Sequence, residues 1–191
     1  PPPPLFFFTH NPATYIGVRL VGSEMCIRDR AQPGLYEAAF GLPLNELLNT
    51  AGVRVGDVQA VLLGGAAGSF LGPQALDLPL SFEDTAERGA TLGSGAVTVF
   101  SRDVDLWPVL VRLAKFFRDE SCGQCVPCRI GTTRQHEVLL QIQGTAPQES
   151  TRDLLSDLSL VMGDSSICGL GHTAASAVQS ALALGLVGAE T

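Results

Sequence analysis

Residues 120–129 read Glu-Ser-Cys-Gly-Gln-Cys-Val-Pro-Cys-Arg, so Cys122, Cys125 and Cys128 follow one another at C-x-x-C-x-x-C spacing. A fourth cysteine, Cys168, lies much further along the chain. A [4Fe-4S] cluster needs four thiolates, one for each iron, and a tight loop supplies three of them at this spacing. The pattern predicts that these four cysteines hold such a cluster and that the chain carries electrons.

Two other chemistries use the same residues. Structural zinc also takes four thiolates, but it usually takes them from two separate C-x-x-C pairs. A redox dithiol would need only Cys122 and Cys125. A two-cluster ferredoxin is disfavoured, because Thr132 stands where that pattern has its next cysteine and Gly169 where a proline follows the last. On spacing alone, zinc and plain thiols remain the alternatives.

The cysteines are expected to lie at helix starts. Pro127 suits a first helical turn, so Cys128 should lie in that turn, with the two preceding cysteines in the loop. Free N–H groups and the positive end of the helix dipole would stabilise an anionic cluster there. Arg129 and Arg134 are expected to add positive charge. Cys168 precedes another expected helix start, so the cluster should join two helices.

Composition limits the class of protein. The 191 residues are 46% hydrophobic and 16% charged, which allows one or two modest cores. A net charge of -7 without a basic block argues against nucleic-acid binding. The five cysteines cluster, unlike those of a disulfide-stapled secreted domain, so a reducing, cytoplasmic setting fits better. Proline or charged residues interrupt every long apolar run, so no direct membrane insertion is expected.

The first thirty residues differ from the rest of the chain. They begin with four prolines, and residues 21–30 resemble a translated sequencing adapter. We therefore expect residues 1–30 to be extraneous to the fold or disordered, and Cys26 to have no role.

The remaining chain predicts an α+β protein. Residues 31–101 should form a small domain with a short helix over 42–48 that ends near Gly52. Strands over 59–63 and 96–100 should belong to a small mixed sheet, with a loop-rich stretch between them. The glycine clusters at 64–68 and 93–95 are interpreted as turns and close backbone contacts, because neither has the strand-then-helix context of a phosphate-binding loop.

Residues 102–191 show helical periodicity. Apolar positions three and four apart predict a helix over 104–118, and further helices are predicted over 127–143, 148–162 and 173–186. Four helices with short connections predict a bundle. His136 and His172 are interpreted as ordinary capping or surface residues, although either could tune a cluster. Nearby carboxylates suit helix caps and solvated faces: Asp103, Asp105, Asp119 and Glu120.

Two segments also carry a resemblance to a known family. Residues 120–132, from Glu120 to Thr132, and residues 166–171, Ser-Ile-Cys-Gly-Leu-Gly, resemble the flavin-bearing NADH-oxidising F-type subunit of respiratory complex I. The same module occurs in NAD-dependent formate dehydrogenases and NAD-linked hydrogenases. The resemblance runs from about Leu35 to the C-terminus. It implies a β-grasp domain of the soluble-ligand-binding (SLBB) type over 31–101, followed by a four-helix iron–sulfur bundle over 102–191.

The resemblance implies an electron-transfer function. In the family, reduced flavin mononucleotide passes single electrons to the cluster, which relays them to partner subunits of an NAD-linked oxidoreductase. The FMN and NADH site lies in a preceding domain, so we expect this chain to be a C-terminal part that does not turn over alone. The implied location is cytoplasmic, at the inner face of a membrane through the complex. The alternative from another class is a zinc-stapled module that only docks subunits.

Overall fold

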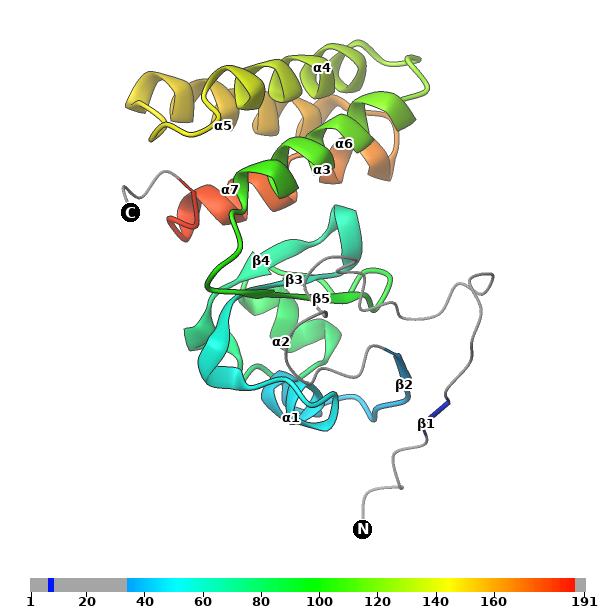
Figure 1. The fold of residues 1–191 in the computed structure, drawn as a ribbon. Coiled ribbons are helices and arrows are strands. Elements are labelled where there is room, and N and C mark those ends of the chain that lie inside the picture. Colours follow the sequence, from blue (N-terminus) through cyan, green and yellow to red (C-terminus); the bar gives the residue numbers. More distant parts are fainter. Residues whose placement is uncertain (1–6, 9–33, 188–191) are drawn as a thin grey trace. The chain divides into compact units, whose positions relative to one another are not determined.

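The computed structural model describes residues 7–8 and 34–187 (Figure 1). The chain divides into two compact units, residues 1–104 and residues 105–191, which are described separately below. The expected domain limits of 31–101 and 102–191 stay predictions. Apart from Phe7 and Phe8, the residues expected to be extraneous lie outside the described part of the chain.

An antiparallel sheet forms the centre of the first unit. Its strands are β3 (Val58–Leu63), β4 (Ser69–Leu71) and β5 (Val97–Ser101), in the order β4-β3-β5. Leu62 pairs with Phe70 on one side and Thr98 on the other. The expectation of a mixed sheet is therefore wrong. The chain reverses directly after β3 to form β4, and a strand that returns through so short a connection must run antiparallel.

Helix α1 (Leu44–Thr50) closes the core of this unit. Pro43 precedes the helix, and Gly52 follows it with φ 74°, as predicted. Leu44 and Leu48 are fully buried and belong to the same hydrophobic cluster as Val61 of β3.

The stretch between the two predicted strands is more ordered than expected. Besides β4, it holds the short helix α2 (Phe82–Glu87), whose N-cap Ser81 accepts a hydrogen bond from the Asp84 N–H at 3.0 Å. Single 3₁₀ turns occupy residues 65–67 and 73–75 of this stretch, and another occupies residues 55–57 before β3. Strands β1 (Phe7–Phe8) and β2 (Leu35–Tyr36) form a separate antiparallel pair. Each of these elements is too short to show its own hydrophobic period.

The glycine clusters form turns in close contact, as predicted. Gly64 has φ 97°, and a Cβ atom there would lie 2.7 Å from the Thr91 carbonyl oxygen. A Cβ atom at Gly93 would lie 2.8 Å from the Gly64 carbonyl oxygen. The two backbones therefore touch where an anion would have to enter.

An apolar cavity of about 370 Å³ lies beside these turns in the first unit. Phe40, Leu47 and Phe82 are among its walls, together with the 93–95 turn. Among its described lining residues, only Tyr36 has an ionisable side chain. The cavity offers hydrophobic packing and no set of groups for acid–base chemistry.

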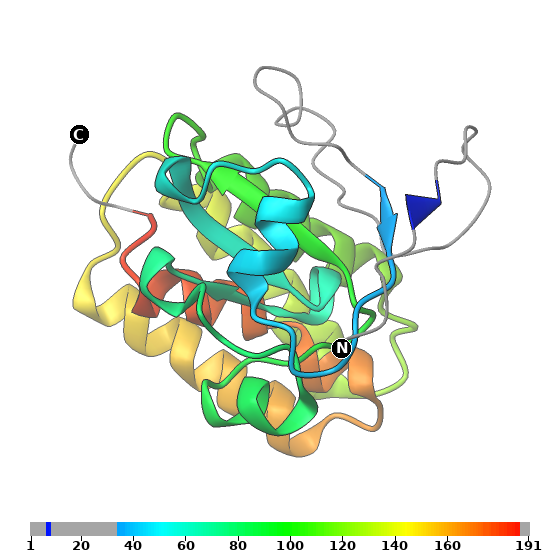
Figure 2. The same ribbon diagram turned by 90° about the horizontal axis from the view of Figure 1, so that it is seen from below.

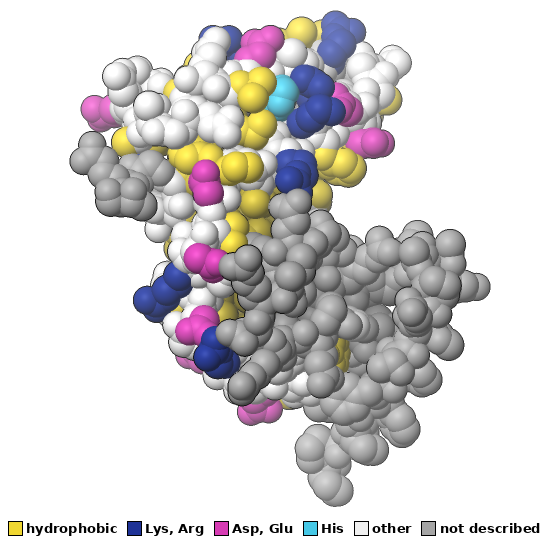
Figure 3. Space-filling model, in the orientation of Figure 1, with side chains coloured by type: hydrophobic (Ala, Val, Ile, Leu, Met, Phe, Trp, Pro, Cys, Tyr) yellow, Lys and Arg dark blue, Asp and Glu magenta, His cyan; other side chains and the backbone are white. Residues whose placement is uncertain are grey.

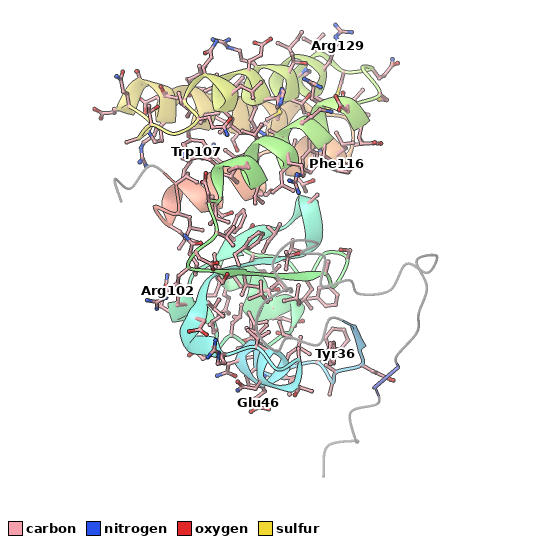
Figure 4. All side chains as sticks on the ribbon, in the orientation of Figure 1. Tyr36, Glu46, Arg102, Trp107, Phe116 and Arg129 are labelled. Carbon is pink, nitrogen blue, oxygen red and sulfur yellow. The ribbon has the colours of Figure 1, made fainter. Side chains whose placement is uncertain are left out.

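The second unit is a helical bundle. Helices α3 (Trp107–Glu120), α4 (Val126–Gln141), α5 (Glu149–Ser165) and α7 (Ser176–Ala183) correspond to the four predicted helices. Figures 1 and 2 show that they lie side by side, and α3 packs against both α4 and α7. Leu110, Ala114 and Phe117 form the buried stripe of α3. Asp105 caps α3 as expected, because its carboxylate accepts a hydrogen bond from the Trp107 N–H at 2.9 Å. Figure 4 labels Trp107.

The last predicted helix, over 173–186, begins later than expected. A short helix, α6 (Gly169–Thr173), precedes α7, and the break falls at Ala174 and Ala175. Gln135 of α4 is fully buried, and its Nε2 donates a hydrogen bond to the Ala174 carbonyl at 2.9 Å. A side chain from another helix thus satisfies a carbonyl at the break. Local periodicity could not reveal this, because Gln135 lies 39 residues away in sequence.

Charges of both signs are mixed on the surface. Figure 3 shows acidic and basic side chains interspersed on the visible face, without a continuous basic area. Among the described residues, no helix combines the length and apolar character needed to cross a bilayer.

Candidate metal centre

Two helix starts carry three of the four cysteines of the predicted site. Cys125 is the N-cap of α4 and Cys128 lies in its first turn, while Cys122 lies in the loop after α3. Cys168 is the N-cap of α6. Neither N-cap cysteine shows the side-chain capping hydrogen bond that a serine or aspartate would make at this position.

The two helix starts approach each other. The Ile167 N–H, next to Cys168, is hydrogen-bonded to the Cys125 sulfur and is the main cause that lowers the pKa of that thiol. The Cys128 N–H, in the first turn of α4, acts in the same direction. Backbone donors at both helix starts therefore favour the thiolate form of Cys125.

Cys128 lies deepest in the site. It is only 4% exposed, and this burial raises the pKa of its thiol. The Ser121 hydroxyl lies 3.4 Å from Cys128 Sγ, and its hydrogen bond lowers the pKa of the Cys128 thiol. The charges of Cys125, Cys168 and Cys122 raise the Cys128 pKa further, which places all four thiols within electrostatic reach of one another.

Exposure differs across the site. Cys128 is buried and Cys125 half-buried, whereas Cys122 and Cys168 are exposed. The spacing of the cysteines indicated four ligands but gave no information about which would face solvent.

The loop before α4 is held in a fixed shape. Gly123 has φ 75°, a conformation that side chains other than glycine rarely adopt, and its N–H donates to Ser121 Oγ at 3.3 Å. Arg129 donates to the Gly123 carbonyl at 3.0 Å, and Figure 4 marks this arginine at the start of α4. Arg134, which was expected to add charge near the cysteines, forms an ion pair with Glu137 at 3.2 Å.

Two buried glycines let the elements of the site meet. A Cβ atom at Gly171 would lie 2.2 Å from Ser166 Oγ and 3.1 Å from Cys128 Cβ. A Cβ atom at Gly131 would lie 2.5 Å from Cγ of the buried Met162. Sequence reasoning did not assign these roles. The only hint was that each glycine stands three residues after a cysteine, one helical turn away.

The two histidines have structural contacts. His172 Nε2 donates to the Ser166 carbonyl at 2.7 Å, a capping role of the predicted kind. His136 is not on the surface: it is 5% exposed, and its Nδ1 lies 3.0 Å from Arg118 Nη1 of α3. Burial is the first cause that lowers the His136 pKa, and the positive charge of Arg118 is the second.

The donor set fits a [4Fe-4S] cluster. Cys122, Cys125, Cys128 and Cys168 are all free thiols and offer one thiolate for each iron of a cube. The buried hydroxyl group of Ser166 has the thiol of Cys125 as its described partner and lowers the pKa of that thiol. A hydroxyl donor that faces a thiol suits a site built around sulfur.

Comparison with known proteins agrees with this chemistry. Residues 108–184 match the family described as the NADH-ubiquinone oxidoreductase-F iron-sulfur binding region. The chain carries the iron–sulfur region of F-type subunits. This F-type region includes all four cysteines of the site, and the α+β fold agrees with the resemblance noted from the sequence.

Relatives come from two kinds of oxidoreductase. The F-type chain of the NADH-quinone oxidoreductase of Rickettsia typhi is 35% identical over 153 residues, 78% of this chain and 36% of the relative. The HndC chain of the NADP-reducing hydrogenase of Solidesulfovibrio fructosivorans is 35% identical over 147 residues, 73% of this chain and 29% of the relative. A crystal structure of an H2-reduced NAD+-reducing [NiFe]-hydrogenase matches with TM-score 0.70 and 34% identity, over 81% of this chain and 26% of the other. The chain described here thus spans about a third of its curated relatives.

Proposed function

We propose that this chain transfers single electrons through one [4Fe-4S] cluster held by Cys122, Cys125, Cys128 and Cys168. The observation that supports it best is that, inside the matched iron–sulfur region, the start of α6 lies against the Cys125 sulfur at the start of α4. When bound, the cluster would supply reversible one-electron chemistry. The alternative docking module would hold a single zinc ion in the same cysteines.

The protein's own groups would hold and insulate the cluster. Cys128 would anchor it on the buried side, where water is excluded. The N–H groups of Ile167 and Cys128 would donate toward Cys125 and offset its negative charge. Arg129 would keep the loop with Cys122 in place through its bond to Gly123. These contacts fix the ligands before any electron arrives.

The exposed side of the site suits exchange with other proteins. Cys122 and Cys168 are exposed, and the apolar side chains of Val126, Ile130 and Ile167 beside them are 58%, 56% and 73% exposed. An apolar surface around a redox centre favours docking of a partner. We propose that the partners are other subunits of a multi-subunit NAD-linked oxidoreductase, peripheral to the inner face of a membrane, in which FMN reduced by NADH is the electron donor.

The proposal also names the kind of complex to which this chain would belong. An NADH:quinone oxidoreductase is our first candidate, because several of the curated relatives carry that name. The structural match to an NAD+-reducing hydrogenase supports a hydrogenase as the second, and an NAD-dependent formate dehydrogenase is implied by the resemblance alone.

Anaerobic reconstitution tests the cluster directly. The purified chain should take up about four irons and, once reduced, give the paramagnetic signal of a [4Fe-4S] cluster. Tight binding of one zinc ion without such a signal would instead support the docking module.

A further inference from the structure

Ser166 is held in place at the centre of the site. It is 9% exposed and follows α5, where its N–H donates to the Met162 carbonyl at 3.2 Å. Its own carbonyl accepts the 2.7 Å hydrogen bond from His172 Nε2. The backbone of Ser166 is thus fixed on both sides, which also fixes where its side chain begins.

The hydroxyl group of Ser166 faces a proposed ligand. Its oxygen is buried, and its described partner is the Cys125 thiol, whose pKa it lowers. The position that a Cβ atom would take at Gly171 is 2.2 Å from this oxygen and 3.1 Å from Cys128 Cβ. The hydroxyl therefore lies among the proposed ligands. Ser121, the other serine near the thiols, already accepts the Gly123 N–H.

We propose that Ser166 donates its hydroxyl proton in a hydrogen bond to a sulfur of the cluster and thereby raises the reduction potential. The inference rests on the proposed function. Reduction adds negative charge to the cluster, so a donor aimed at its sulfur stabilises the reduced form more than the oxidised form. A buried hydroxyl group that already faces a proposed ligand sulfur can direct its proton to the cluster without giving up a hydrogen bond elsewhere.

Ser166→Ala removes the donor, and Ser165→Ala provides the matched control, because Ser165 is the exposed last residue of α5. The wild-type chain and both variants are reconstituted anaerobically, and their iron content and midpoint potentials are measured. We expect about four irons in all three proteins. The midpoint of Ser166→Ala should shift to lower potential, while that of Ser165→Ala should equal the wild-type value.

The outcomes separate this inference from the proposed function. An unchanged midpoint in Ser166→Ala would overturn the inference and leave the cluster assignment standing. Iron loss in Ser166→Ala alone would overturn it too, because Ser166 would then serve structure. A wild-type chain that binds no cluster would overturn the proposed function itself.

A spectroscopic measurement gives a second, independent test. Electron–nuclear double resonance of the reduced proteins, prepared in H2O and in D2O, detects exchangeable protons coupled to the cluster. Ser166→Ala should lose one such coupling, whereas Ser165→Ala should retain it. The N–H groups of Ile167 and Cys128 remain in every variant. Identical couplings in wild type and Ser166→Ala would contradict the proposed hydrogen bond.

Discussion

Two of the four cysteines occupy the same structural position. Cys125 and Cys168 are both N-cap residues with extended backbone, and neither uses its side chain to close its helix. A serine or aspartate at such a position normally bonds back to the N–H groups of the first turn. A thiol is a weaker acceptor than a hydroxyl or carboxylate oxygen, so a cysteine at this position holds these N–H groups less firmly.

Cys168 supplies the ligand that closes the site. Cys168→Ser should weaken iron retention at least about tenfold, since changes even beyond the direct ligands cost that much at metal sites. Iron and labile sulfide are measured after reconstitution and desalting. Cys26→Ser, at the cysteine with no expected role, is the matched control and should retain full iron. Equal iron content in the two variants would argue against the three-plus-one ligand set.

His136 gives the helical unit a dependence on pH. Burial and the charges of Arg118 and Lys115 keep its pKa below the ordinary value of 6.5, and the negative charges of Asp119 and Glu137 oppose them only partly. The unfolded chain therefore binds this proton more readily than the folded chain. The stabilisation is complete above the ordinary pKa and is lost as pH falls through the lower folded value.

The free energy of unfolding should therefore fall as pH decreases below about 6.5. Denaturant titrations at several pH values measure this slope. His136→Asn retains an acceptor for Arg118 but does not titrate in this range, so its slope should be smaller at the same iron loading. Parallel slopes for the two proteins would mean that His136 is not the group responsible.

Helices α4 and α5 meet through one glycine. The Cβ atom of an alanine at residue 131 would lie 2.5 Å from Met162 Cγ, and Met162 is fully buried. Gly131→Ala should therefore destabilise the chain by about 1 to 3 kcal/mol, the usual cost of overpacking.

Gly163→Ala in α5 is the control, because a Cβ atom there meets nothing within 4 Å. This variant should gain up to about 1 kcal/mol from the better helix propensity of alanine. The two free energies of unfolding are compared by denaturant titration. A gain in stability for both variants would show that Met162 moves aside without cost.

Long elements with a repeated apolar pattern could be predicted from the sequence, whereas very short elements could not. Helix α3 was predictable because Leu110, Ala114 and Phe117 repeat at the helical period over several turns. Strand β4 has three residues, so it left no period to detect. The break before α7 is bridged by the side chain of Gln135 from another helix. The position of Ser166 is set by a contact that forms only in the folded chain, the hydrogen bond from His172 to its carbonyl. Spacing thus predicted the candidate ligands, whereas the groups around them required the tertiary structure.

At the scale of the whole molecule, the described cysteines all lie in the second compact unit. Cluster loading should therefore slow amide hydrogen exchange in α4 and α6 by stabilising the bundle. The β3 strand, which lies in the first unit, should exchange at the same rate with and without iron. Exchange measured by mass spectrometry on the full chain checks this. Equal protection of the sheet would show that the two units unfold together.

The three-plus-one arrangement of the cysteines also determines when the complete ligand set becomes available during translation. On the proposed ligand set, Cys122, Cys125 and Cys128 leave the ribosome together, whereas Cys168 follows about 40 residues later. At typical translation rates this delay is roughly 2 to 8 s. During that interval the nascent chain presents three thiols without the fourth. Insertion of a complete cube must therefore wait until translation has passed Cys168 and the bundle can fold around it.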